Sequence, residues 1–184
     1  TNLLGINLVQ EIEEKPYDKI YQYDELGVNQ GIGNNSTSIW GANVFTRDIS
    51  TINDKEEYIN EIGIQLISTQ GIEIYLNPDN DNFSESILVA TPGALEAGYH
   101  TIKLPSPIKL TGEKFIVSVK YINTEGAQVP IETNLKESGL TYVDNIYDTA
   151  TANLGESFIS VDGTTWQELN GIEIENAVTL KNTN

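Results

Sequence analysis

Short stretches in which apolar and polar residues alternate dominate the chain. In residues 61–67, Ile62, Ile64 and Leu66 occupy every second position, and the same period of two recurs in 114–121. Side chains at every second position of a strand point to the same face, so this pattern predicts half-buried β-strands. Further strands are predicted at 72–76, Ala42–Thr46, Ser86–Thr91, Tyr99–Leu104, Gln128–Thr133, Ser157–Val161, Thr164–Leu169 and Asn176–Lys181.

Turn-forming residues separate these strands. Asp162 and Gly163 stand alone between two predicted strands, and this dipeptide is typical of a hairpin closed by a two-residue type I′ turn. Strands about ten residues apart with Gly, Pro, Asn and Asp between them are typical of sandwiches and jelly rolls. Short helical turns are predicted only at Asn53–Tyr58 and Thr91–Glu96. The predicted fold is therefore all-β: a two-sheet, antiparallel, jelly-roll-like β-sandwich with one or two helical turns.

The length of 184 residues fits one domain with a substantial core. We assign residues 17–181 to the sandwich, residues 1–16 to a linker or a segment leading into it, and residues 182–184 to a tail. The chain contains no methionine, which indicates a segment excised from a longer polypeptide.

Charge and composition exclude several classes of function. Lys and Arg number 10 against 27 Asp and Glu, which gives a net charge of −17. Nucleic acids and anionic membranes repel such a surface, so neither is expected as a partner. No apolar run approaches the roughly 18 residues that a membrane span needs, so no membrane insertion is expected. The absence of cysteine excludes disulfides, thiolate nucleophiles and Cys-ligated metals.

The sequence gives little support for catalysis. The single histidine, His100, alternates in phase with Ile102 and Leu104, which places it on the apolar side of a strand rather than beside a nucleophile. No Gly-x-Ser-x-Gly elbow is present. Acidic pairs such as Glu56–Glu57 are typical of a solvated face in an acidic protein, and a glycan hydrolase is a distant alternative. We therefore predict no catalytic residue.

A loop rich in Asn and Asp is the best candidate for a metal site. Asp79, Asp81 and Glu85 can offer several oxygens to a calcium ion from one short segment. The loop departs from the helix–loop–helix calcium motif, which has an oxygen donor at the position of Phe83. A solvated turn is the alternative interpretation. Asp24 is a second candidate, either as a ligand of a structural cation or as the cap of the following turn.

Sugar binding requires an exposed aromatic ring flanked by polar groups, because the C–H faces of a sugar stack on the ring while its hydroxyls bind the polar groups. Trp40 follows the polar loop 34–38, and Tyr21 and Tyr23 lie earlier in the chain. These three residues are the carbohydrate-binding candidates. In the alternative, Trp40 packs over a sheet edge and the two tyrosines pin the N-terminal segment onto the sandwich.

Several blocks of sequence, in order, resemble a known family. The chain resembles the lectin-like domain that accompanies papain-like cysteine peptidases in clostridia and their relatives. The blocks are YDKIYQYDELGVNQGIG (17–33), SIWGANVF (38–45), ILVATPGALEAGYHTIKLPSPIKLTGEKFIVSVKY (87–121), ESFISVDGTTWQEL (156–169) and NAVTLK (176–181).

The resemblance implies a β-sandwich accessory module without catalysis of its own, with a peptidase domain N-terminal to it in the parent polypeptide. It also implies an extracellular or cell-surface location. Calcium binding is known in the family, and carbohydrate binding is mostly inferred from the fold. Residues 77–86 depart from the family, which has a Gly/Ser-rich turn there. The leading hypothesis is a non-catalytic module that positions a peptidase or binds cell-surface carbohydrate, with a structural calcium ion. The alternative is a structural spacer with no ligand.

Overall fold

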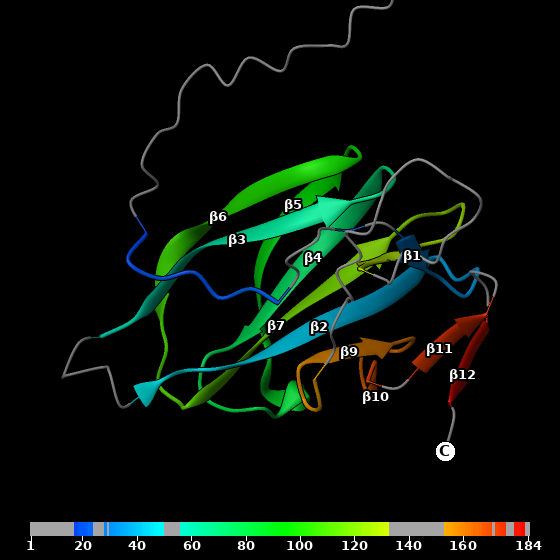
Figure 1. Ribbon diagram of the computed structural model, residues 1–184. Coiled ribbons are helices and arrows are strands. Elements are labelled where there is room, and N and C mark those ends of the chain that lie inside the picture. Colours follow the sequence, from blue (N-terminus) through cyan, green and yellow to red (C-terminus); the bar gives the residue numbers. More distant parts are fainter. Residues whose placement is uncertain are drawn as a thin grey trace, which may run out of the picture.

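Two layers of β-sheet face each other in the computed structural model (Figure 1). It describes residues 17–23, 28, 30–49, 56–132 and 153–170, together with the backbone of 172–175 and 179–182. The larger layer is a six-stranded sheet in the order β10-β9-β2-β7-β4-β5, and the smaller layer is the antiparallel pair β3-β6. Two further antiparallel pairs, β1-β8 and β11-β12, form separate sheets, and Ile32 and Val129 of the first pair belong to the main buried cluster. The strands are β1 (Gln30–Ile32), β2 (Ser38–Thr46), β3 (Tyr58–Leu66), β4 (Gln70–Asn77), β5 (Ile87–Leu95), β6 (Gly98–Lys109), β7 (Lys114–Ile122), β8 (Val129–Ile131), β9 (Ser157–Ser160), β10 (Gln167–Glu168), β11 (Ile172–Glu175) and β12 (Thr179–Asn182).

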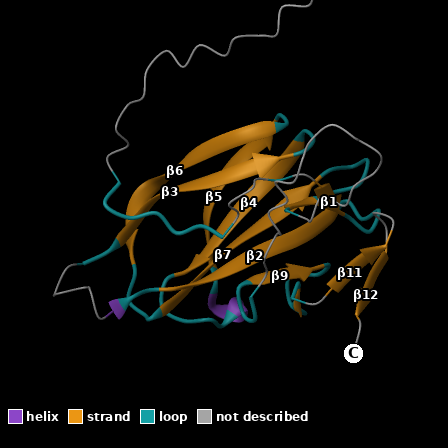
Figure 2. Cartoon of the chain, viewed as in Figure 1, coloured by secondary structure: helices purple, strands orange, loops and turns teal. Residues whose placement is uncertain are grey.

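The main core lies between the two layers. Ile62, Ile64 and Leu66 alternate along β3 and are buried, as the pattern predicts. They belong to the same buried cluster as Ile72 and Ile74 of β4. Burying each of these side chains stabilises the fold by about 1.5–3 kcal/mol, so the alternation itself fixes which face of each strand turns inward. The prediction of an all-β sandwich is confirmed, and Figure 2 shows how little of the chain is helical.

The six-stranded sheet is also covered on its other face. Ile116 of β7 is fully buried there beside Ala42 and Val44 of β2. The 3-10 turn η2 (Phe83–Glu85) and the β9-β10 hairpin supply the aromatic side chains that pack against this cluster. The centre of β2 and β7 is therefore buried on both faces, which explains their nearly continuous apolar sequences.

One predicted helical turn is wrong. Residues 91–95 continue strand β5 rather than forming a helix at Thr91–Glu96. Pro92 is tolerated because β5 is the edge of the six-stranded sheet and its register with β4 shifts between Gly93 and Ala90, so that Pro92 is paired with no residue of β4. Of the other predicted turn, Asn53–Tyr58, residues 53–55 lie outside the described residues, and Tyr58 opens strand β3.

The hairpin at Asp162–Gly163 exists, but its turn is longer than predicted. Strand β9 ends at Ser160 and β10 begins at Gln167, so the type I′ prediction is wrong. The Asp162 carboxylate accepts hydrogen bonds from the backbone N–H of Thr164 and of Thr165, both at 2.7 Å. These hydrogen bonds stabilise a loop that is wider than the predicted two-residue turn. Gly163 has a φ of +76°, which suits glycine.

Strands β1 and β11 were not predicted, and the strand predicted at 164–169 is reduced to the two residues of β10. No helix within the described part of the chain is long and apolar enough to cross a membrane.

Candidate functional site

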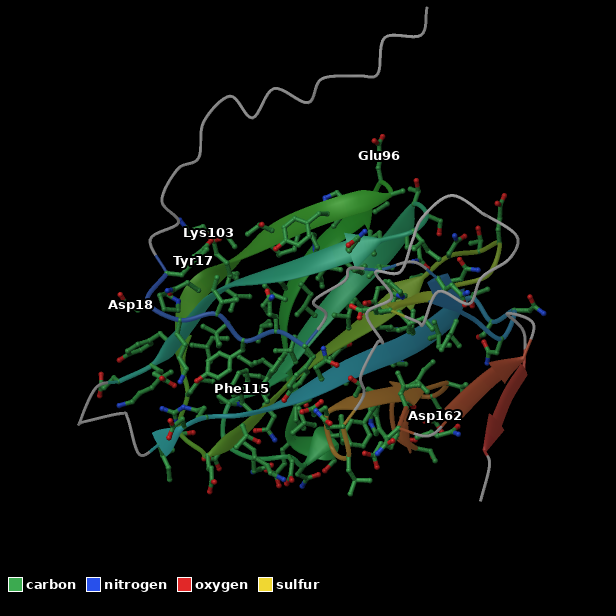
Figure 3. The ribbon with its side chains drawn as sticks, in the orientation of Figure 1. Tyr17, Asp18, Glu96, Lys103, Phe115 and Asp162 are labelled. Atoms are coloured by element: carbon green, nitrogen blue, oxygen red, sulfur yellow. The ribbon has the colours of Figure 1, made fainter. Side chains whose placement is uncertain are left out.

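Residues 17–23, here called the N-terminal strap, run from β3, where Tyr17 donates to Glu61, to β2, where Tyr23 donates to the carbonyl of Val44. Tyr17, Lys19, Tyr21 and Tyr23 make contacts with the sandwich, whereas the intervening Ile20 is 63% exposed. This alternation is what an extended chain produces when one of its faces lies against a surface. Figure 3 shows Tyr17 and Asp18 at the start of the strap.

The strap covers a part of the core that the narrow β3-β6 layer leaves open. The ring of Tyr21 meets the ring of Phe115 edge-on at 4.9 Å between centroids, and Tyr23 stacks on Phe45 at 4.8 Å. Phe115 is only 1% exposed. Leu76 and Leu110 complete this apolar floor. The two tyrosines, which are carbohydrate candidates by sequence, thus pack the N-terminal segment onto the sandwich.

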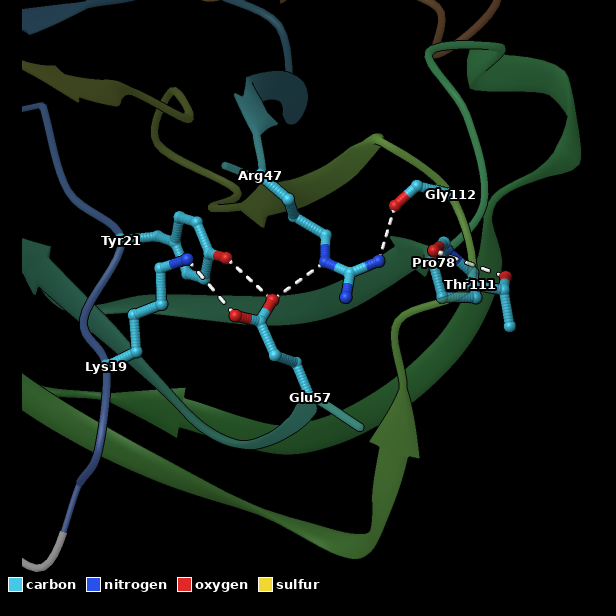
Figure 4. Close-up of polar contacts among 7 residues, drawn as sticks. All are labelled: Lys19, Tyr21, Arg47, Glu57, Pro78, Thr111 and Gly112. Carbon is cyan, nitrogen blue, oxygen red and sulfur yellow. Dashed lines mark hydrogen bonds and ion pairs between the residues drawn. The ribbon is translucent and has the colours of Figure 1, made fainter. Parts of the chain in front are cut away.

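The carboxylate of Glu57 binds two side chains of the strap and one of the sandwich (Figure 4). The Lys19 ammonium lies 3.1 Å from it, the Tyr21 hydroxyl donates to it at 2.9 Å, and Arg47 Nε donates at 2.7 Å. Arg47 is 7% exposed and also donates to the carbonyl of Gly112 at 2.6 Å. Glu57 therefore joins the strap to Arg47 and, through Arg47, to the loop at Gly112.

The electrostatics of this network favour its charged form. Burial alone raises the pKa of Glu57, but the donors on Arg47, Tyr21 and Lys19 outweigh it and hold that pKa below its ordinary value. Burial raises the pKa of the Tyr21 hydroxyl, which keeps it a hydrogen-bond donor. Farther along the strap, the Tyr23 hydroxyl donates to the carbonyl of Val44 at 2.7 Å.

Trp40 lies on the opposite face of the six-stranded sheet from this network. Trp40 and Phe45 are an odd number of residues apart on β2, and the pairing of β2 with β7 has no bulge between them. Their side chains therefore point to opposite faces of the sheet, and Tyr23 stacks on the face that holds Phe45. The structure therefore does not bring Trp40 together with Tyr21 and Tyr23. The indole is half-buried, with Tyr75 at 4.9 Å and the edge of Trp166 at 6.4 Å between ring centroids.

Polar groups surround the Trp40 ring. The Lys120 ammonium lies 5.6 Å from the ring centroid and 3.4 Å from the Glu73 carboxylate. The Tyr75 hydroxyl donates to Glu73 at 2.8 Å, and burial, reinforced by that hydrogen bond, raises the pKa of Tyr75 to about 12. An aromatic ring beside a carboxylate and an ammonium is a chemistry that sugars bind.

Sequence reasoning missed Glu73 and Lys120 because their proximity to Trp40 depends on strand pairing. Trp40 pairs with Lys120, and Lys120 pairs with Glu73, so the three form one row across β2, β7 and β4. This row could have been found from the sequence only by predicting the correct register between the three strands.

The carboxylates of the Asn- and Asp-rich loop have separate protein partners. Asp79 accepts from the Thr111 hydroxyl at 2.9 Å, and Asp81 pairs with Lys114 at 2.7 Å, which lowers the pKa of Asp81. Glu85 accepts from the amides of the neighbouring asparagines 80 and 82. Asp24 lies outside the described residues. In the part of the chain that the structure describes, no group of three or more His, Asp or Glu side chains is arranged to hold a metal ion.

His100 lies on β6 in phase with the half-buried Ile102 and the buried Leu104, as the sequence predicts. Its Nε2 atom is 2.8 Å from the carbonyl oxygen of Glu96. That contact closes the β5-β6 connection locally and involves no other ionisable side chain.

The fold and these surfaces define a β-sandwich module of the lectin-like class. The chain belongs to the lectin like domain family, whose model matches residues 20–183. This confirms the family to which the sequence blocks point. A search of curated proteins gave no significant match.

Solved structures of the clostridial cysteine protease Cwp84 share this fold. One, determined after propeptide cleavage, superposes with a TM-score of 0.61 at 23% identity, over 83% of this chain and 36% of that protein. Another holds the cysteine protease and lectin-like domains of Cwp84, described as a surface layer associated protein of Clostridium difficile. It gives a TM-score of 0.54 at 23% identity, over 73% of this chain and 29% of that one. The chain thus spans about a third of the length of these proteins.

Proposed function

We propose that this chain is a non-catalytic accessory module of a secreted or surface-associated cysteine peptidase, and that it holds the peptidase in a defined position. The observation that carries this proposal is the anchoring of the N-terminal strap by Glu57, Phe45 and Phe115. A domain that precedes the strap in a longer polypeptide would leave the sandwich from a fixed point. The similar Cwp84 structures, in which a cysteine protease domain accompanies a lectin-like domain, support the same assignment.

The test uses a polypeptide in which the peptidase domain precedes this chain. The double variant Tyr21→Ala/Tyr23→Ala should release the strap and broaden the distribution of distances between the two domains, measured by fluorescence energy transfer between site-specific labels. Ile20→Ala is the matched control, because this strap side chain faces outward. An unchanged distribution in the double variant would contradict the positioning role.

Carbohydrate binding at Trp40 is a second candidate function, favoured by the row formed with Lys120 and Glu73. On a glycan array, Trp40→Ala should weaken binding to cell-surface glycans by about tenfold, because a stacking interaction of about 1.4 kcal/mol is lost. Tyr99→Ala is the control, since Tyr99 is an aromatic residue of the other layer that is 63% exposed. Binding absent from the wild type, or equal in Trp40→Ala, would leave the structural-spacer hypothesis standing.

A structural calcium ion held by Asp79, Asp81 and Glu85, or by Asp24, belongs to the same proposal. Millimolar calcium should then raise the melting temperature and EDTA lower it, because a ligand that binds only the folded state stabilises it. Magnesium serves as the control ion. Asp79→Asn should abolish the shift if the loop binds the ion, and Asp24→Asn should abolish it if Asp24 does. A melting temperature that is unchanged by calcium would remove the metal from the proposal.

A further inference from the structure

The surface beneath the N-terminal strap has the properties of a peptide-binding site. We infer that it is a recognition groove for an extended Lys-x-Tyr-x-Tyr segment, filled by the chain's own residues 19–23 and able to accept the same segment of a second copy. The inference shares the strap with the proposed function, but it concerns how the strap binds and needs no peptidase.

Side chains hold the strap in place. Within the described residues, the strap belongs to no strand, and the backbone–backbone hydrogen bonds outside the sheets include none from it. Lys19, Tyr21 and Tyr23 make contacts at positions i, i+2 and i+4, and Tyr17, two residues earlier, donates to Glu61. These are the positions that an extended chain presents on one face. A segment attached in this way can leave without breaking a sheet.

Two parts of the receptor recognise the three side chains. Glu57 receives both the Lys19 ammonium and the Tyr21 hydroxyl, so it selects a cation two residues before a phenol. The Lys19 ammonium also lies 4.8 Å from the centroid of the Tyr21 ring. Tyr23 is recognised by the face of Phe45 and, through its hydroxyl, by the carbonyl of residue 44. Leucine or phenylalanine at positions 21 and 23 would leave these polar partners unused.

The receptor is held together by contacts that do not involve the strap. Arg47 fixes the Glu57 carboxylate and is itself fixed by the carbonyl of Gly112. Phe45 and Phe115 stack on each other at 5.2 Å, from paired positions of β2 and β7. A preformed site loses little conformational freedom on binding, which favours recognition of a short peptide.

The charge of the occupant also fits. Lys19 is a basic residue in a chain with a net charge of −17, and it meets a carboxylate whose pKa is lowered. In one molecule the attached strap is present at an effective concentration of about millimolar, so it outcompetes a free copy at lower concentration. Binding of the strap of a second copy can therefore be detected only when the chain's own strap binds more weakly.

The experiment uses the full chain with Tyr21→Ala/Tyr23→Ala in its own strap and a fluorescein-labelled synthetic peptide covering residues 16–24. Fluorescence anisotropy should show saturable binding to this variant and binding at least about tenfold weaker to the wild-type chain, whose groove is filled. A peptide with Tyr21 and Tyr23 replaced by alanine should not bind, whereas one with Ile20→Ala should bind like the native peptide. Adding Glu57→Gln to the receptor should weaken binding.

Two results would overturn the inference. One is a double variant that is folded by circular dichroism but does not bind the peptide at millimolar concentration. The other is equal binding to the variant and to the wild-type chain. Should the double variant unfold, excess peptide must restore its melting transition, and the milder Lys19→Ala/Tyr23→Phe variant must bind the peptide more tightly than the wild type does. Failure of both would show that the strap is a permanent part of the core, a result that leaves the positioning role intact.

Discussion

Gly112→Ala is expected to lower the free energy of unfolding by about 3 kcal/mol, the upper part of the usual range for overpacking. A Cβ atom at this position would lie 1.5 Å from the carbonyl oxygen of Asp79, and the atoms nearest to it are all backbone. Two loops cross here, since the N–H of Gly112 donates to the carbonyl of Pro78 at 3.2 Å. Backbone cannot move aside like a flexible side chain, so one loop must be displaced. Equilibrium denaturation monitored by tryptophan fluorescence measures the effect.

The control for this substitution is Gly71→Ala in β4. The nearest atoms to a Cβ there are 3.6 Å away, an ordinary van der Waals distance. The free energy of unfolding of this variant should stay close to that of the wild type. Because the Gly112 carbonyl also anchors Arg47, Gly112→Ala should in addition loosen the Glu57 network and expose the strap to proteolysis. A loss below 1 kcal/mol in Gly112→Ala would mean that the crossing of the two loops is far more adaptable than its geometry indicates.

Glu57→Ala is expected to destabilise the fold by about 2 kcal/mol. Removing one partner of a buried ion pair leaves the other charge without compensation, at a cost of several kcal/mol when both are fully buried. Arg47 is 7% exposed but the Glu57 side chain is 20% exposed, which moderates the loss. The neighbouring Glu56→Ala is the matched control: its pair with Lys109 is exposed, and its loss should change the stability little. Equal effects of the two substitutions would contradict a central role for Glu57.

The same carboxylate gives the stability a pH dependence with a defined sign. Because the folded-state pKa of Glu57 lies below its unfolded value, its contribution is fully present above that unfolded value, near 4.5. It is lost as the pH falls through the lower folded-state pKa. The difference in unfolding free energy between the wild type and Glu57→Gln should therefore be constant between pH 7 and about pH 5 and shrink in more acidic solution. A difference that grows on acidification would show that Glu57 is not stabilised as a carboxylate.

Sequence reasoning succeeded where the signal was local. The alternation predicted strands β3 and β7 with the correct faces toward the main core, because burial of every second residue leaves that period in the sequence. The half-buried prediction is wrong for β7, since Ile116 and Ser118 on its other face are buried as well. Sequence reasoning failed at residues 91–95, where pairing with β4 draws a Pro-Gly segment into an edge strand. The sequence also predicted too short a turn at Asp162. The Asp-Gly dipeptide does not reveal that the Asp162 carboxylate binds the backbone N–H groups of Thr164 and Thr165 and so stabilises a wider loop.

The sequence by itself determined that this chain is a β-sandwich of the lectin-like family, because strand periodicity and the ordered blocks of residues are local patterns that need no knowledge of tertiary contacts. The tertiary structure decided what the aromatic and charged residues do. Tyr21 and Tyr23 are half-buried and pack against the core, and Trp40 lies on the other face of the sheet. Glu57 became the anchor of the strap. These roles depend on contacts between residues tens of positions apart, which strand register and layer packing fix and which no local pattern encodes.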